Sequence, residues 1–97
     1  MDAWCYILFS HKLNRFYIGS TELFPDERLI LHLNKAYGLS KFTAKADDWE
    51  IFLSIHCNSI KQARNIESHF KKMRNSKYYV WLAQNPDAID RIKEKYT

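Results

Sequence analysis

The chain has 97 residues, of which 46% are hydrophobic and 27% are charged. This length and balance predict one small globular domain over residues 1–97, and they exclude a mainly disordered chain and a coiled coil. The first residues lack the basic start of a signal peptide, and no apolar run approaches the roughly 18 residues that cross a bilayer. We therefore expect a cytoplasmic protein without membrane contacts. The two cysteines, Cys5 and Cys57, stand in apolar stretches at no disulfide or zinc-site spacing, which predicts two buried free thiols.

The net charge of +4 is concentrated in one part of the chain. Residues 1–48 carry six basic and six acidic side chains, whereas residues 61–77 carry six basic side chains against one acid, Glu67. The basic members of this stretch are Lys61, Arg64, Lys71, Lys72, Arg74 and Lys77. A local positive field attracts polyanions, of which nucleic acid is the commonest, although a solvated helix face can have the same composition.

Two short apolar stretches, residues 4–10 and 15–20, are rich in aromatic and β-branched side chains and predict two strands. The four-residue loop between them predicts an antiparallel hairpin. In that register Tyr6 faces Gly19 and Leu8 faces Tyr17, so the two tyrosines lie on one face of the sheet. Gly19 leaves an open position beside Tyr6. Two tyrosines placed in this way either pack the sheet or belong to a site.

A first helix is predicted to begin near Pro25, which two acidic residues follow, and to end near Gly38. Its expected apolar side consists of Leu29, Ile30, Leu33, Ala36 and Tyr37. Arg28 and His32 are neighbours four residues apart, with Lys35 on the same flank. Two or three cationic donors on one flank can hold a phosphate, and the alternative is a solvated helix edge.

The rest of the chain predicts one more strand and three more helices. Residues 49–56 alternate between two faces, with Trp49, Ile51, Leu53 and Ile55 on one of them. A helix over residues 59–74 opens with a capping box formed by Ser59 and Gln62. A short helix over residues 78–83 and a last helix that begins at Asn85-Pro86 follow. The predicted class is α+β, with the order ββαβα and additional C-terminal helices.

Glu67 stands out on the helix that spans residues 59–74. At 100° per residue it falls inside the apolar arc of that helix. The arc consists of Ile60, Ala63, Ile66, Phe70 and Met73. A carboxylate in such a place must be paired, bound to a metal or protonated. The sequence leaves two readings open, a metal ligand or an internal ion pair with Lys71 or Arg74.

Taken together, these residues resemble the GIY-YIG nuclease family. Tyr17-Ile18-Gly19 matches the second half of the family name without change, and Trp4-Cys5-Tyr6 keeps only the tyrosine of the first half. The family's arginine, histidine and metal-binding glutamate correspond to Arg28, His32 and Glu67, and its frequent lysine one turn later to Lys71. Gly38 and Thr43 stand where small members often have a glycine and a threonine. The likeness covers about residues 4–77.

The resemblance implies a three-stranded antiparallel sheet flanked by helices. It also implies the hydrolysis of phosphodiester bonds in nucleic acid, with DNA as the expected substrate. It implies that Glu67 holds Mg²⁺, or Mn²⁺, and that Arg28 stabilises the pentacoordinate phosphate. Tyr6 or Tyr17 would take the proton of the attacking water, with Tyr17 favoured, and His32 would orient that tyrosine or relay its proton. Several family nucleases have an asparagine where this chain has Tyr79, and the nearest asparagine is Asn75.

A basic surface would bind backbone phosphates, which position a strand without reading its sequence. The residues expected on it are Lys35, Arg64, Lys71, Lys72, Arg74 and Lys77. The chain contains no separate recognition module, so we expect low intrinsic sequence specificity or targeting by a partner protein. Two alternatives stay open: a non-catalytic nucleic-acid-binding module with the nuclease fold, and a protein-interaction domain in which Glu67 forms a structural ion pair.

Overall fold

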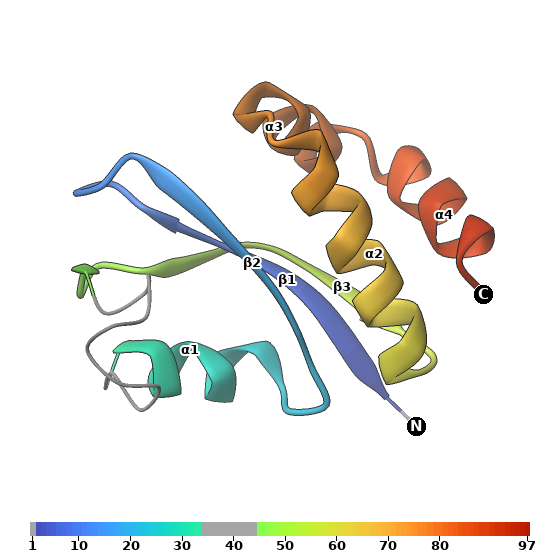
Figure 1. The fold of residues 1–97 in the computed structure, drawn as a ribbon, viewed down its shortest axis with the longest axis horizontal. Coiled ribbons are helices and arrows are strands. Elements are labelled where there is room, and N and C mark those ends of the chain that lie inside the picture. Colours follow the sequence, from blue (N-terminus) through green and yellow to red (C-terminus); the bar gives the residue numbers. More distant parts are fainter. Residues whose placement is uncertain (1, 34–44) are drawn as a thin grey trace.

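The computed structural model describes residues 2–33 and 45–97, which form a three-stranded antiparallel sheet and helices on both of its faces (Figure 1). The elements in chain order are β1 (Ala3–Ser10), β2 (Arg15–Thr21), α1 (Pro25–Leu33), β3 (Glu50–Cys57), α2 (Ile60–Met73), α3 (Ser76–Gln84) and α4 (Pro86–Lys95). The α+β class and the element order predicted from the sequence are confirmed. Gly38, Thr43, Lys35, Ala36 and Tyr37 lie outside the described residues.

The hairpin has the predicted register. Ser10 pairs with Arg15, Leu8 with Tyr17 and Tyr6 with Gly19. The strand order is β2-β1-β3, so β1 is central and β2 is an edge strand. One edge of the sheet therefore presents the triplet Tyr17-Ile18-Gly19, with side chains directed alternately to the two faces.

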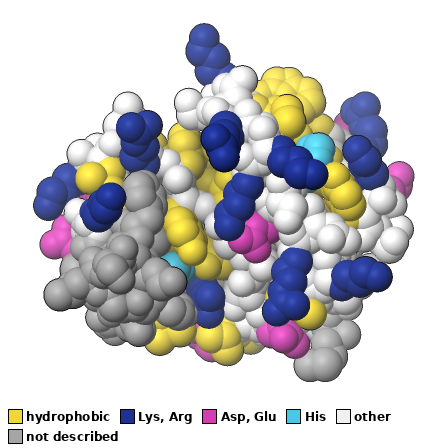
Figure 2. All heavy atoms as spheres, in the orientation of Figure 1, with side chains coloured by type: hydrophobic (Ala, Val, Ile, Leu, Met, Phe, Trp, Pro, Cys, Tyr) yellow, Lys and Arg dark blue, Asp and Glu magenta, His cyan; other side chains and the backbone are white. Residues whose placement is uncertain are grey.

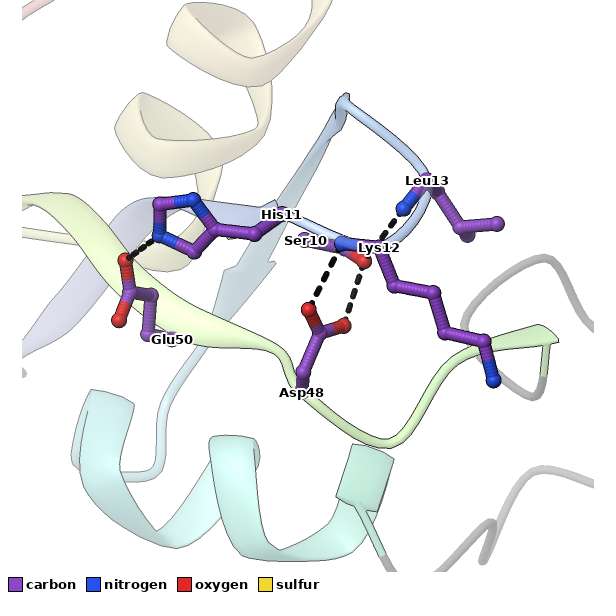
Figure 3. A network of polar contacts seen from close by, with 6 residues as sticks. All are labelled: Ser10, His11, Lys12, Leu13, Asp48 and Glu50. Atoms are coloured by element: carbon purple, nitrogen blue, oxygen red, sulfur yellow. Dashed lines mark hydrogen bonds and ion pairs between the residues drawn. The ribbon is translucent and has the colours of Figure 1, made fainter.

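A hydrogen-bond network ties the hairpin loop to the segment that enters β3 (Figure 3). The Ser10 hydroxyl donates to Asp48 Oδ1 at 2.5 Å, and the Lys12 N–H donates to Asp48 Oδ2 at 2.8 Å. The Leu13 N–H donates to Ser10 Oγ at 3.1 Å. The hydrogen bond from Ser10, followed by that from Lys12, holds the pKa of Asp48 below its ordinary value. This loop is thus fixed by the fold and is structural.

β3 departs from the alternation that the sequence predicted. The register shifts between Ile7, which pairs with Leu53, and Leu8, which pairs with Ile51. This β-bulge inserts Phe52 as an extra residue. Leu53 then packs on the α2 side of the sheet, whereas Ile51 packs on the α1 side. The prediction that Trp49, Ile51, Leu53 and Ile55 share one face was therefore wrong, because a bulge exchanges the two faces along the strand.

Two apolar layers hold the fold together. The larger layer lies between the sheet and helices α2, α3 and α4, and it includes Cys5, Ile7, Ile66, Phe70 and Leu82, all fully buried. The smaller layer lies on the α1 side and consists of Tyr6, Leu8, Ala46 and Trp49, with Tyr17, Leu29 and Leu33 packed against it. Figure 1 shows α1 on one side of the sheet and the other helices on the opposite side.

α2 follows the predicted pattern except at its end. Ser59 caps it, since its hydroxyl accepts from the Gln62 N–H at 3.1 Å, but Gln62 bonds back to the Asn58 N–H and not to that of Ser59. Met73, expected in the apolar arc, is 43% exposed because the helix ends there and Arg74 adopts a left-handed conformation with φ 44°. The last turn therefore extends beyond the layer that the rest of α2 covers.

The apolar side predicted for α1 is also partly wrong. Ile30 is 56% exposed, whereas His32 is buried. Leu29 and Leu33 pack as predicted. The helix is thus rotated so that a polar side chain, and not Ile30, enters the interior beside the hairpin.

Both cysteines are free and buried, as the sequence predicted. Burial raises the pKa of each thiol, so both stay protonated at neutral pH. Among the described residues, the helices are too short or too polar to cross a membrane.

Candidate active site at the edge strand

Tyr6 is fully buried on the α1 face of the central strand. Its neighbour across the hairpin is Gly19, and a Cβ atom at that position would overlap the phenol ring and hydroxyl of Tyr6. Glycine is thus required here by the close approach of a ring and not by backbone conformation. The pair fixes the position of the Tyr6 hydroxyl beneath the edge strand.

A hydrogen-bonded chain joins Tyr6 to α1. Arg28 Nε donates to the Tyr6 hydroxyl at 3.3 Å, and the same hydroxyl lies 2.9 Å from His32 Nε2. Burial, with a smaller effect of the Arg28 charge, lowers the pKa of His32 to about 4, so its ring is neutral at pH 7. Because arginine can only donate, the Tyr6 hydroxyl accepts from Arg28, and a His32 tautomer with an unprotonated Nε2 can accept the Tyr6 proton. His32 is therefore an interior group and Arg28 is half-buried beside it, so they do not form the solvated helix edge that the sequence left open.

Tyr17 lies on the same face and beside the same histidine. Its ring centroid is 5.1 Å from that of His32 and 6.4 Å from that of Trp49. Unlike Tyr6, Tyr17 is only half-buried, and its strand borders a cavity of about 370 Å³ whose Lys71, Arg74 and Tyr79 lie on the α2 side of the sheet. The structure thus brings Tyr6, Tyr17, Arg28 and His32 together, as predicted, and distinguishes the two tyrosines by their access to solvent.

The cavity beside Tyr17 is basic. Arg15 from β2, Lys71 and Arg74 from the end of α2, and Tyr79 from α3 all line it. The left-handed conformation of Arg74 ends α2 at this point. Arg15 was not among the residues predicted for the site, although its place next to Phe16 and Tyr17 at the start of the edge strand is a signal that could have identified it.

Glu67 lies on the other face of the sheet, against the same edge strand. The Ser20 hydroxyl donates to Glu67 Oε1 at 2.6 Å, and Lys71 Nζ donates to Glu67 Oε2 at 2.6 Å. The Glu67 side chain is 19% exposed. The ion pair with Lys71 is one of the two predicted pairings. Ser20, which follows Gly19 directly, was not predicted, and it connects Glu67 to the strand that holds Tyr17.

The donors around Glu67 fit a hard divalent cation. Both are oxygen ligands, a carboxylate and the Ser20 hydroxyl, and Mg²⁺ takes one or two protein carboxylates together with water and substrate phosphate. Within residues 2–33 and 45–97 there is no group of three or more His, Cys, Asp or Glu side chains, so a zinc-type cage is not formed there. Lys71, whose side chain is 54% exposed, holds the carboxylate by an ion pair that a cation could displace.

Lys and Arg side chains are spread over the face that presents α2, α3 and the edge strand (Figure 2). Of the residues predicted to bind phosphate, Arg64, Lys71, Lys72, Arg74 and Lys77 are all exposed, and Lys35 lies outside the described residues. Lys71 and Arg74 line the cavity beside Tyr17, whereas Lys77 lines a neighbouring hollow with Phe9 and Asn14.

A family model described as the GIY-YIG catalytic domain matches residues 2–79. The chain belongs to the GIY-YIG family. It is therefore a member of a nuclease family, and nucleic acid is the substrate that its domain implies. The comparisons with curated proteins and with solved structures found no match.

Neither residue considered for the family's asparagine offers a polar group to the site in this chain. The Tyr79 hydroxyl donates to the Phe70 carbonyl at 2.8 Å inside the core, so Tyr79 packs α3 against α2. Asn75 caps α3 by accepting from the Lys77 N–H at 3.0 Å. In this GIY-YIG protein both side chains have structural hydrogen bonds.

Proposed function

We propose that this chain is a metal-dependent endonuclease that hydrolyses phosphodiester bonds in DNA with low intrinsic sequence specificity. The main support is that one edge strand joins all the required groups. Tyr17 and the Tyr6–Arg28–His32 chain lie on one of its faces, and Glu67 reaches it through Ser20 on the other. These groups come from four different elements, β1, β2, α1 and α2, and a structural ion pair alone would not require them.

Tyr17 is the better general base of the two tyrosines. The Tyr6 hydroxyl is buried and bonded to both Arg28 and His32, so water and substrate do not reach it. Tyr17 is only half-buried on the α1 face, so water and a substrate phosphate can approach it. As a phenolate, Tyr17 would take the proton from the attacking water, and the positive charge of Arg28 on the same sheet face would stabilise that phenolate beforehand.

Arg28 and the cavity cations would bind the phosphate. Guanidinium groups stabilise the charge that develops on phosphate oxygens in phosphoryl transfer. Glu67, with Ser20 beside it, would hold Mg²⁺ or Mn²⁺, which when bound polarises the scissile phosphoryl oxygen and offsets charge on the leaving oxygen. Lys71 would hold the carboxylate in place through its ion pair until then. His32, as a neutral acceptor, would position Tyr6 and, through it, Arg28.

The proposal is tested by incubating supercoiled plasmid DNA with the full chain, with and without MgCl₂. We expect nicked circles that appear only with the metal and that EDTA prevents. A non-catalytic binding module would shift the mobility of the DNA but leave it supercoiled at every metal concentration. A parallel reaction with RNA of the same sequence tests the preference for DNA.

A further inference from the structure

A second cavity of about 360 Å³ lies between α2, α3 and α4, on the side of α2 away from the sheet. His69 and Tyr78 line it from α2 and α3, and Arg91 and Lys95 line it from α4. Most of its lining follows residue 79, where the family match ends. None of the catalytic roles proposed above uses this cavity.

An open aromatic platform forms one wall. Trp81 stacks on Tyr78, with ring centroids 6.0 Å apart and an angle of 24° between the planes. Trp81 is nevertheless 49% exposed, and a tryptophan is large enough that such exposure leaves much of one indole surface available. The two residues are three apart on α3 and therefore lie on the same side of that helix.

The platform is fixed in place by the half-buried side chain of His69. His69 Nδ1 lies 3.0 Å from the Tyr96 hydroxyl and His69 Nε2 lies 3.3 Å from the Tyr78 hydroxyl. Burial, aided by the charges of Lys95 and Lys72, lowers the pKa of His69, so the ring is neutral and can donate at one nitrogen and accept at the other. The Tyr78 ring is thus held in the orientation that Trp81 stacks on.

The opposite wall is cationic. Arg91 and Lys95 are four residues apart on α4, and Lys95 Nζ lies 5.5 Å from the centroid of the Tyr96 ring. No acidic side chain is among the described residues that line the cavity. An exposed aromatic surface facing two cations is the combination that binds single-stranded nucleic acid, in which bases stack and phosphates pair with basic side chains.

We propose that this cavity binds an unpaired base of a nucleic-acid strand, stacked on Trp81, with the flanking phosphates on Arg91 and Lys95. An acidic peptide would use the same cations but would gain little from an indole surface. The cavity and the edge-strand site lie on opposite sides of the end of α2, since Lys71 and Arg74 face one and His69 faces the other. Because a helix is about 10 Å across, the two sites are separated by about the length of three nucleotides in a stacked strand.

This inference rests on the proposed function for one consequence: the nuclease would favour DNA that has an unpaired segment a few nucleotides from the cut. The binding itself is measured without metal, so it does not depend on cleavage. If the wild-type protein does not nick DNA but Trp81→Leu weakens single-strand binding, this inference stands and only the nuclease proposal is contradicted. If the wild-type protein nicks DNA but Trp81→Leu binds single strands as wild type does, only this inference is contradicted.

The experiment compares a short fluorescein-labelled single-stranded oligodeoxynucleotide with a blunt duplex of the same sequence, by fluorescence anisotropy in EDTA. Trp81→Leu removes the aromatic surface but keeps an apolar side chain, and Trp81→Phe retains a smaller aromatic surface. We expect Trp81→Leu to weaken single-strand binding roughly 5- to 100-fold and to leave duplex binding nearly unchanged, with Trp81→Phe in between. Arg91→Gln and Lys95→Gln should each lower the salt dependence of single-strand binding.

Three results would overturn the proposal: unchanged single-strand affinity in Trp81→Leu, an equal loss for strand and duplex, or binding of a labelled polyglutamate peptide that Arg91→Gln abolishes while single-strand binding persists. Should Trp81→Leu not fold, as judged by thermal unfolding, Trp81→Phe and Arg91→Gln still decide the question, because neither empties the core.

Discussion

At the scale of single residues, the two tyrosines of the hairpin differ in what surrounds their hydroxyls. The Tyr6 hydroxyl is buried and hydrogen-bonded to His32 and Arg28, whereas Tyr17 is only half-buried. Their neighbouring positions on one sheet face follow from the hairpin register and were predicted. Their different access to solvent follows from how α1 covers the sheet, which the sequence did not reveal.

We expect Tyr17→Phe to lose most of the cleavage rate with little change in DNA affinity, because the missing hydroxyl acts only in the transition state. The ring would still pack beside His32 and Trp49, so stability should change little. Tyr6→Phe should retain more of the rate but lower stability by about 1 kcal/mol, since it removes the buried hydroxyl that is hydrogen-bonded to His32 and Arg28. Single-turnover cleavage and urea unfolding of both variants check this. A dead Tyr6→Phe and an active Tyr17→Phe would reverse the assignment of the base.

His32 should make the fold sensitive to acid. Its pKa is lowered to about 4 in the folded protein from 6.5, so the unfolded chain binds the proton more readily between these values. The free energy of unfolding should therefore fall as the pH drops from 7 to 4, by on the order of 3 kcal/mol from this residue. Burial lowers the pKa of His69 too, which adds a slope of the same sign.

Urea unfolding at a series of pH values checks the acid sensitivity. His32→Gln should flatten the curve between pH 4 and 6.5, while His11→Gln, which changes an exposed histidine, should not. Identical slopes for wild type and His32→Gln would contradict the assignment of His32 as a neutral interior group.

At the scale of elements, the edge strand β2 decides how the site is assembled. It presents Tyr17 on one face and Ser20 on the other, and Gly19 between them accommodates the Tyr6 ring. A single strand can thus place a phenol and a carboxylate on the two sides of one sheet edge.

Gly19→Ala should test this close packing. The added Cβ would overlap a fully buried ring, and such overpacking costs about 1–3 kcal/mol. Ser54 on β3, the strand that flanks β1 opposite β2, is also paired with Tyr6 and is exposed. Ser54→Ala is therefore the matched control and should change the free energy of unfolding by less than about 0.5 kcal/mol. Equal stabilities of Gly19→Ala and wild type would show that the Tyr6 ring can move aside.

The elements themselves were largely predictable, because periodicity, capping residues and prolines act locally. The register of the hairpin followed from loop length, and the start of α4 from Asn85-Pro86. The bulge at Phe52 was not predictable, since it depends on how β3 fits the central strand. The exposure of Ile30 and the burial of His32 were missed for a similar reason, because the rotation of α1 is set by its packing on the sheet.

The sequence identified most residues of the candidate site, but not the contacts that join them. Glu67 was identified from the helical wheel, and both a metal ligand and an ion pair were considered. The structure contains the ion pair with Lys71 and adds Ser20, whose role depends on a contact across 47 residues of sequence. Arg15 likewise becomes part of the cavity only when the end of α2 meets the edge strand.

At the scale of the whole molecule, the charge distribution should govern binding. The exposed cations of α2 and α3 lie around the cavity and on the surface beside it. Phosphate contacts release counterions, so affinity should fall linearly with the logarithm of salt concentration. Lys72→Gln, Arg74→Gln and Lys77→Gln should each reduce this slope by about 0.9 for duplex DNA of any sequence.

Anisotropy titrations at several salt concentrations measure these slopes. Lys12→Gln, on the hairpin loop, is the matched control and should leave the slope unchanged. An affinity that does not vary with salt would show that the basic surface is only solvated and makes no phosphate contacts.

The most direct test of the nuclease account is single-turnover cleavage of DNA by Glu67→Gln at saturating Mg²⁺, beside wild type and Glu94→Gln. Glutamine can still accept from Ser20 and preserves the shape of the side chain, so the fold should survive, which thermal unfolding checks. Glu94 is an exposed acid on α4 and its substitution should leave the rate unchanged. We predict that Glu67→Gln abolishes Mg²⁺-dependent cleavage while DNA binding persists. Undiminished cleavage by a folded Glu67→Gln protein would contradict the account.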